Sequence, residues 1–154
     1  MTQTLAEALT KEHADIDAGI EAFLAGQAEG RPSTDGMLSV IAAQRRHIYL
    51  EEAILFPPLR QAGLFAPVLV MLMEHGRMWH VMDALEPLLR AGAADTEVTG
   101  LCRELVDLLA SHNPKEEQII YPQADTTLQW PASGHLKEFL ESGEMPDGWV
   151  CEKA

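Results

Sequence analysis

The sequence predicts an all-α fold: an up-down-up-down four-helix bundle followed by a short C-terminal helical arm. Apolar residues recur at steps of three and four along four long stretches, which is the period of one helix face. Short segments containing Gly or Pro separate these stretches, and short connections favour antiparallel neighbours. The chain has 154 residues, which is enough for one domain with a substantial core.

The first two helices have clear boundary signals. The first is expected over residues 4–27, because Gly30 and Pro32 follow it closely. The second is expected to begin with an N-cap among residues 33–35, where Ser, Thr and Asp stand in a row. It should continue to about residue 61, just before Gly63.

The third helix should begin near Pro67, a favoured first-turn residue, and end near residue 91. The fourth should begin after Asp95 or Thr96 and reach about Tyr121, with a local bend rather than a break at Pro114. These boundaries divide the chain into a bundle over residues 1–122 and an arm over residues 123–154. The arm should carry one short helix over residues 133–142 and pack on the bundle.

The composition restricts the possible partners and the compartment. The formal net charge of −13 argues against nucleic acid, which proteins bind through clustered Lys and Arg. The longest apolar stretch, residues 64–73, is too short to cross a membrane, and no signal-peptide pattern opens the sequence. We therefore expect a cytoplasmic protein. Cys102 should be packed as a small apolar residue, and Cys151 should be a solvent-side thiol in the tail.

One unusual motif occurs twice in the chain. It reads His-x3-Glu-Glu-x-Ile-(Leu or Ile)-aromatic-Pro, and it spans residues 47–57 and again 112–122. A shorter Glu-His pair also occurs twice, at residues 12–13 and 74–75. Together the two repeats supply four imidazoles and two carboxylates, which is the inventory of a site for two metal ions.

These polar residues interrupt the apolar stripes of the four predicted helices. At about 1.5 Å per residue, all of them should lie at a similar depth, roughly 10–20 Å from one end of an antiparallel bundle. The predicted ligands are His13 from the first helix, His47 and Glu51 from the second, His75 from the third, and His112 and Glu116 from the fourth.

The chemistry of these residues favours bound cations. Burying an unpaired carboxylate costs several kcal/mol, and here two carboxylates should be buried together. Imidazole and carboxylate ligands without thiolate suit iron, manganese or zinc, and paired carboxylates favour two bridged ions. A lone histidine on an apolar stripe is more often a core residue than a ligand, and a His-x3-Glu pair can lie on a helix surface. Four separate helices with the same placement favour the metal site.

Other polar side chains near the motifs are assigned to other roles. Glu52 and Glu117 lie on a different side of their helices and should be solvated or should support the ligands from outside. His80 should point away from the site, and His135 should be exposed or packed in the arm. Tyr121 is close enough to hydrogen-bond near the site, but it is expected to act mainly in packing.

At these residues the chain resembles the hemerythrin-like family, also called the HHE cation-binding domain, over residues 4–122. The resemblance rests on the repeated Glu-His pairs and on both copies of the longer motif, in the family's order. It implies a non-haem centre with two iron ions, in preference to manganese or zinc. By this resemblance, Glu51 and Glu116 would bridge the ions, His13 and His47 would bind one iron, and His75 and His112 would bind the other.

One departure affects the expected function. Oxygen-carrying hemerythrins of invertebrates have a His-x3-His pair on the third helix, whereas here Trp79 stands four residues after His75. One iron should therefore have an extra open position, unless His80 or a glutamate compensates. We expect a di-iron protein that binds a small diatomic ligand, O2 or NO, for sensing, carriage or detoxification.

Two alternatives use the same centre. The protein would be an oxidoreductase that consumes peroxide or NO, or an iron-responsive or metal-holding module whose helices order when metal binds.

Overall fold

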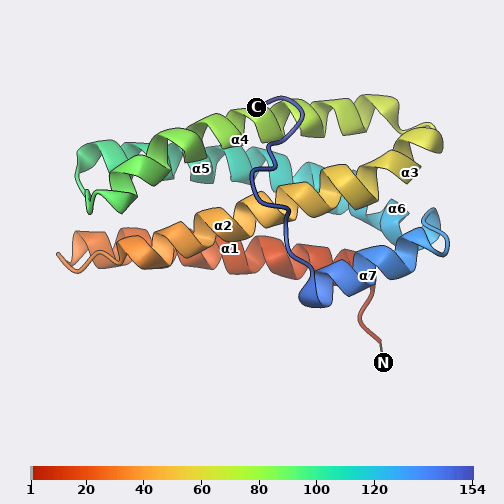
Figure 1. Cartoon of the computed structure of the whole chain (residues 1–154), viewed down its shortest axis with the longest axis horizontal. Helices are drawn as coiled ribbons and strands as arrows, with labels where there is room; N and C mark the ends of the chain where they lie inside the picture. The colour runs from red at the N-terminus through yellow and green to blue at the C-terminus, as the bar shows by residue number, and fades with distance from the viewer. Residues whose placement is uncertain (1) are drawn as a thin grey trace.

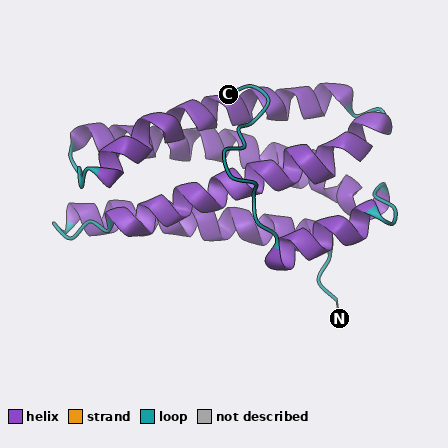
Figure 2. Ribbon diagram, viewed as in Figure 1, coloured by secondary structure: helices purple, strands orange, loops and turns teal. Residues whose placement is uncertain are grey.

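The computed structural model describes residues 2–154, and within these residues it contains helices and loops without a β-strand. Four long helical rods form the bundle, and a shorter helix packs against its side near one end (Figures 1 and 2). The elements are α1 (Leu5–Ala28), α2 (Thr34–Leu50), η1 (Glu51–Leu55), α3 (Phe56–Gln61), α4 (Phe65–Arg90), α5 (Thr96–Lys115), η2 (Glu116–Ile120), α6 (Tyr121–Thr126) and α7 (Ala132–Ser142).

The predicted up-down-up-down topology is confirmed. Helices α1 and α4 run in one direction and α2 and α5 in the other, with α1 and α4 each beside α2 and α5 (Figure 1). The predicted boundaries need small corrections. The third rod begins at Phe65 rather than Pro67, and the fourth runs through α6 to Thr126 rather than ending at Tyr121. Helix α5 continues through Pro114 without a break, as expected.

Side-chain caps fix the starts of three rods. Thr4 accepts a hydrogen bond from the Glu7 amide at 3.1 Å, and the Glu7 carboxylate accepts one from the Thr4 amide at 2.9 Å, which is a complete capping box. Ser33 caps α2, and Asp95 caps α5. Each cap satisfies amide groups that a helix leaves without partners, and such a cap contributes roughly 1 kcal/mol.

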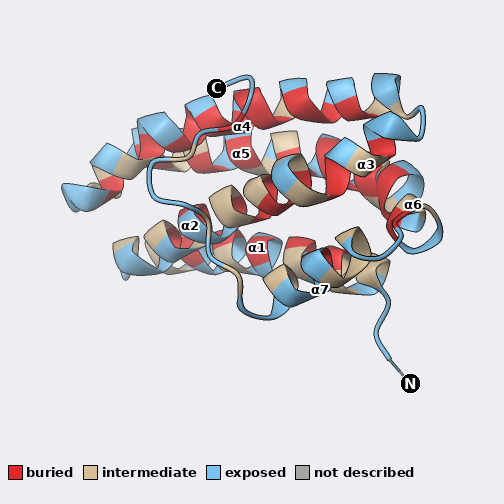
Figure 3. Ribbon diagram, turned by 45° about the vertical axis from the view of Figure 1, so that its right-hand side comes forward, coloured by how far each residue is buried: buried red, intermediate tan, exposed pale blue. Residues whose placement is uncertain are grey.

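Two clusters of buried apolar side chains fill the bundle, one on each side of a layer of buried polar residues. The buried residues of the long helices lie toward the inside of the bundle (Figure 3). On α1, Leu9 belongs to one cluster and Ile16 to the other, and His13 lies between them. On α4, Leu72 and Met78 bracket His75 in the same way. The apolar clusters therefore hold the polar layer rigidly and away from solvent.

Two short π-helical segments, η1 and η2, interrupt the second and fourth rods, where periodicity predicts regular α-helix. The Phe56 amide donates to the Glu51 carbonyl, and the Tyr121 amide donates to the Glu116 carbonyl, so each bond spans five residues instead of four. A proline follows each aromatic residue. Because proline has no N–H for the usual helical bond, it favours a wider turn just before it.

The C-terminal segment folds back over the bundle. Helix α7 lies against α1, α2 and η1, and the last residues cross over α4 (Figure 1). The Lys153 carbonyl lies so close to Gly76 that a Cβ there would be 2.5 Å from its oxygen. The prediction that Cys151 is a solvent-side thiol is wrong, because this crossing buries it at 3% exposure.

Among the described residues, no helix is long and apolar enough to span a membrane.

Candidate metal centre

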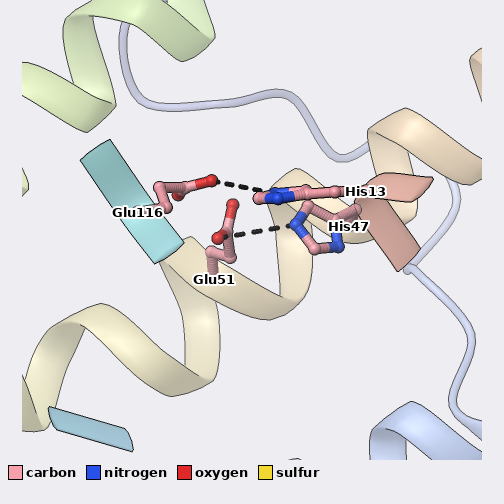
Figure 4. Close-up of side chains that lie close together, drawn as sticks. All are labelled: His13, His47, Glu51 and Glu116. Atoms are coloured by element: carbon pink, nitrogen blue, oxygen red, sulfur yellow. Dashed lines mark hydrogen bonds and ion pairs between the residues drawn. The ribbon is translucent and has the colours of Figure 1, made fainter. Parts of the chain in front are cut away.

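The structure brings all six predicted ligands into the buried polar layer. Each of the six residues is at most 3% exposed. Glu51 and Glu116 are the first residues of the two π-segments, and their carboxylates point toward the rings of His13 and His47 (Figure 4).

Ligand-type atoms of these residues form two overlapping groups in which all atoms lie within 4.8 Å of one another. The first half-site consists of His13, His47, Glu51 and Glu116, and the second half-site consists of Glu51, His75, His112 and Glu116. The two carboxylates belong to both half-sites. This arrangement fits two neighbouring cations held by shared carboxylates.

Short distances define the first half-site. His13 Nε2 lies 3.1 Å from Glu116 Oε1. His47 Nε2 lies 3.5 Å from Glu51 Oε2. Figure 4 shows both carboxylates turned toward the imidazole nitrogens that face the interior.

The second half-site has the same construction on the other pair of helices. His75 Nε2 lies 3.3 Å from Glu51 Oε1 and 3.8 Å from Glu116 Oε2. His112 Nε2 lies 2.9 Å from Glu116 Oε1. Each histidine therefore presents Nε2 to the shared carboxylates.

The other ring nitrogen of every histidine is bound by a carboxylate from a neighbouring helix. We call Glu12, Glu52, Glu74 and Glu117 the outer carboxylates. The Nδ1 distances are 2.8 Å for His47–Glu12, 2.7 Å for His75–Glu52, 2.9 Å for His112–Glu74 and 2.8 Å for His13–Glu117. Because a carboxylate only accepts, each Nδ1 donates, and Nε2 is left to face the interior.

Glu52 and Glu117 were predicted to be either solvated or in contact with the ligands from outside. The second alternative is confirmed, because each hydrogen-bonds the Nδ1 of a histidine. The roles of Glu12 and Glu74 were not predicted, although both residues belong to the repeated Glu-His pairs. Each binds the histidine of the next helix rather than its own neighbour. The repeated Glu-His pair carried this signal without showing which helix the carboxylate would reach.

The clustered charges shift the pKa values of the ligand-type groups. Burial alone would lower the pKa of His47, but the Glu51 and Glu12 carboxylates raise it to about 10. Burial opposes the same effect at His112, where Glu116 and Glu74 raise the pKa to about 10. Burial would raise the pKa of Glu51, but His47 and other neighbours hold it well below its usual range. The layer therefore has a strong field that favours positive charge between the carboxylates.

Tyr121 takes part in the site, so the prediction that it acts mainly in packing is wrong. Its hydroxyl donates to Glu51 Oε2 at 2.8 Å and lies 2.8 Å from His13 Nε2 and 2.9 Å from His47 Nε2. Burial, together with Glu116 and Glu51, raises the pKa of its phenol well above the usual value. Both imidazoles that its hydroxyl contacts belong to the first half-site.

Three buried atoms of the second half-site form no hydrogen bond, although His75 Nε2 lies 3.3 Å and 3.8 Å from the two carboxylate oxygens among them. They are Glu51 Oε1, His75 Nε2 and Glu116 Oε2. An unpartnered buried polar atom costs about 1–3 kcal/mol, so three in one place indicate a missing partner. One cation would satisfy all three at once. The residues present therefore fit a bound metal ion.

His80 and His135 are both exposed and lie outside the two groups, as expected. Trp79 is buried and packs edge-on against Trp149, with the Arg45 guanidinium over its ring. Helix α4 thus contributes one histidine, His75, to the layer.

The comparison with protein families agrees with this geometry. The model of the hemerythrin HHE cation-binding domain matches residues 4–124. Comparison with curated proteins and with solved structures gave no match. The match covers most of the chain, including both Glu-His pairs and both copies of the longer motif. The chain therefore belongs to the hemerythrin HHE cation-binding domain family.

Proposed function

We propose that this protein is a non-haem di-iron protein that binds a small diatomic ligand, O2 or NO, at the iron of the second half-site. The proposal follows the six-ligand assignment made from the sequence: His13, His47, His75 and His112 as terminal ligands, with Glu51 and Glu116 shared. It also places the protein in the cytoplasm.

The observation that carries the proposal is the difference in how the two half-sites are satisfied. In the first half-site the Tyr121 hydroxyl contacts both imidazole nitrogens. In the second, three buried ligand-type atoms have no partner. The second half-site therefore has both the stronger need for a cation and fewer protein groups to complete its coordination.

The donor set favours iron. Imidazole with carboxylate is the ligand combination of non-haem iron proteins, and carboxylate-bridged pairs inside helix bundles are typical of di-iron centres. When bound, the two ions would supply the electrons that a bound O2 or NO requires.

The protein's own residues keep the site ready for this chemistry. The outer carboxylates hold each imidazole in one orientation with Nε2 directed inward, so little reorganisation accompanies metal binding. The apolar clusters on either side exclude water, which protects a bound ligand from side reactions.

A surface hollow is lined in part by residues that contact the second half-site. It has a volume of about 480 Å³, and Glu52 and Phe56 form part of its lining. Both residues contact His75: Glu52 hydrogen-bonds its Nδ1, and the Phe56 ring stacks on the imidazole at 5.7 Å. Glu52 and Phe56 therefore connect the lining of the hollow to a histidine of the second half-site.

Anaerobic loading with ferrous iron, followed by O2 or NO, tests this function. We expect a visible absorption band that appears with the gas and disappears when the gas is removed under vacuum. Irreversible oxidation with many turnovers of peroxide or NO would show an oxidoreductase instead. Iron loading that changes helix content without any response to gas would show a metal-holding module.

A further inference from the structure

The two copies of the long motif differ at one position that bears directly on the centre. Tyr121 in the second copy corresponds to Phe56 in the first, each followed by proline. From this difference and the contacts below, we infer that the Tyr121 oxygen is a fifth protein ligand of the ion in the first half-site, which leaves the two ions inequivalent. The inference rests on the dinuclear centre proposed above.

The two aromatic rings occupy equivalent places in the structure. Tyr121 and Phe56 each donate their backbone amide across a π-turn to a shared carboxylate residue. The Tyr121 ring lies 5.2 Å from His13, and the Phe56 ring lies 5.7 Å from His75. Both residues are fully buried, at 0% and 1% exposure. The site is therefore nearly symmetric except for one hydroxyl group.

The position of that hydroxyl matches a corner of a coordination polyhedron. Each corner of an octahedron has four neighbouring corners, at about 3.0 Å for metal–ligand distances of about 2.1 Å. The Tyr121 oxygen lies 2.8 Å from His13 Nε2, 2.9 Å from His47 Nε2, 2.8 Å from Glu51 Oε2 and 3.3 Å from Glu116 Oε1. These four atoms come from the four residues of the first half-site, one atom from each residue.

In the metal-loaded centre, a hydrogen-bonding role alone would not satisfy these contacts. Metal binding requires neutral imidazoles, and their Nδ1 protons already bind the outer carboxylates, so both Nε2 atoms face Tyr121 as acceptors. The two carboxylate oxygens are acceptors as well. One hydroxyl hydrogen serves one of these four acceptors, whereas a cation among them serves all four and the phenol oxygen too. On coordination the phenol proton is released to solvent.

The consequence is a division of labour between the ions. The first ion has two imidazoles, two shared carboxylates and Tyr121. The second ion has two imidazoles and the same carboxylates, with the Phe56 ring in place of an oxygen ligand. An added ligand should therefore bind the second ion, where the unpartnered atoms lie.

The chain allows a clean spectroscopic test, because it has two tyrosines. Tyr49 is the matched control: its ring packs against Phe139 and Trp149 rather than in the polar layer. Ferric-loaded wild type, Tyr49→Phe and Tyr121→Phe are compared by iron analysis, visible absorption and resonance Raman scattering. We expect a phenolate-to-iron charge-transfer band in wild type and in Tyr49→Phe, and its loss in Tyr121→Phe.

A second measurement is independent of how Tyr121→Phe folds. Ring-deuterated tyrosine in the Tyr49→Phe protein labels Tyr121 alone, and its phenolate vibrations should shift with the label.

The outcomes separate this inference from the proposed function. Two irons per chain without a phenolate band in wild type would overturn the role of Tyr121 and leave the dinuclear centre standing. A wild-type protein that binds no iron would overturn both. A band that survives Tyr121→Phe would also contradict the assignment.

Discussion

Glu12 directly precedes His13 in the sequence, yet its carboxylate binds His47 on the neighbouring helix, with Oε1 2.8 Å from Nδ1. The other three outer carboxylates also bind a histidine of a neighbouring helix. Glu52 of η1 binds His75 of α4, Glu74 of α4 binds His112 of α5, and Glu117 of η2 binds His13 of α1. This closed ring joins all four rods. The orientation of every imidazole therefore depends on correct packing of the whole bundle.

Glu117 offers the simplest test of this ring, because its carboxylate hydrogen-bonds His13 Nδ1. Glu117→Gln should weaken metal binding by roughly 10–100-fold, since the outer partner of a ligating histidine fixes its orientation and basicity. Competition with a chelator of known affinity measures the change. Glu21→Gln, at an exposed position on the same helix as His13, is the control and should leave affinity unchanged. Equal affinities in the two variants would refute the supporting role.

The proposed ligands can be tested by removal. His47→Ala and Glu116→Ala should each lose most of the bound metal, because each takes one buried ligand from a half-site. His135→Ala should keep the wild-type metal content, because His135 is exposed in α7. Elemental analysis of the three purified variants, with helix content checked by circular dichroism, gives the answer. The same metal content in all three would rule out the assignment.

Metal affinity should rise with pH between about 6.5 and 10. The carboxylates raise the pKa of His47 and His112 to about 10 in the folded protein, so both hold protons at neutral pH without metal. Ligation needs neutral imidazoles, and each released proton makes affinity increase by about tenfold per pH unit below the pKa.

Calorimetric titration with ferrous iron under anaerobic conditions, in buffers of different ionisation enthalpy, counts the released protons. The same two shifts predict that the metal-free fold is favoured below about pH 6.5 and loses this contribution as pH rises through about 10. Affinity that does not vary with pH would contradict the charge state assigned to the layer.

The C-terminal crossing depends on Gly76. Gly76→Ala places a Cβ 2.5 Å from the Lys153 carbonyl oxygen, so the last residues should be displaced from α4. Cys151 is 3% exposed, and burial raises the pKa of its thiol to about 11. Titration with a thiol reagent under native conditions should therefore find no rapidly reacting thiol in wild type and one in the variant.

Gly100→Ala is the matched control, because a Cβ at Gly100 meets nothing within 4 Å. It should leave both thiols unreactive and stabilise α5 by about 0.5–1 kcal/mol. If Gly76→Ala also leaves both thiols unreactive, the crossing does not depend on close contact at this glycine.

Periodicity was sufficient to predict the bundle and the convergence of the six side chains. Residues at steps of three and four share a helix face. In an antiparallel bundle, residues that are equally many positions from the same end of the bundle lie at the same depth, because each residue adds the same rise along the helix. His13 and Glu116 are far apart in the sequence, but these two rules bring them to one layer. The structure places His13 Nε2 3.1 Å from Glu116 Oε1.

The role of Tyr121 was hidden by the regular helix that periodicity assumes. Five residues after Glu116, a regular α-helix would place Tyr121 about 140° around the axis from it. The π-segment inserts one residue into the turn, which reduces the angle to about 40° and brings the hydroxyl into the layer. The sequence contained a signal for this, because Pro122 follows the turn.

The partners of Glu12 and Glu74 could not be derived from one helix at a time. Periodicity gives the face of a residue but not the height and rotation of the neighbouring helix, on which the pairing depends. The burial of Cys151 was missed for a related reason, since the final residues have no periodic pattern and are held by a close approach at Gly76.

Anomalous diffraction at the iron edge from crystals of iron-loaded protein tests the central claim most directly. The account predicts two peaks per chain, one bounded by His13 and His47 and the other by His75 and His112, with Glu51 and Glu116 contacting both. A single peak, or iron bound only outside this layer, would contradict it.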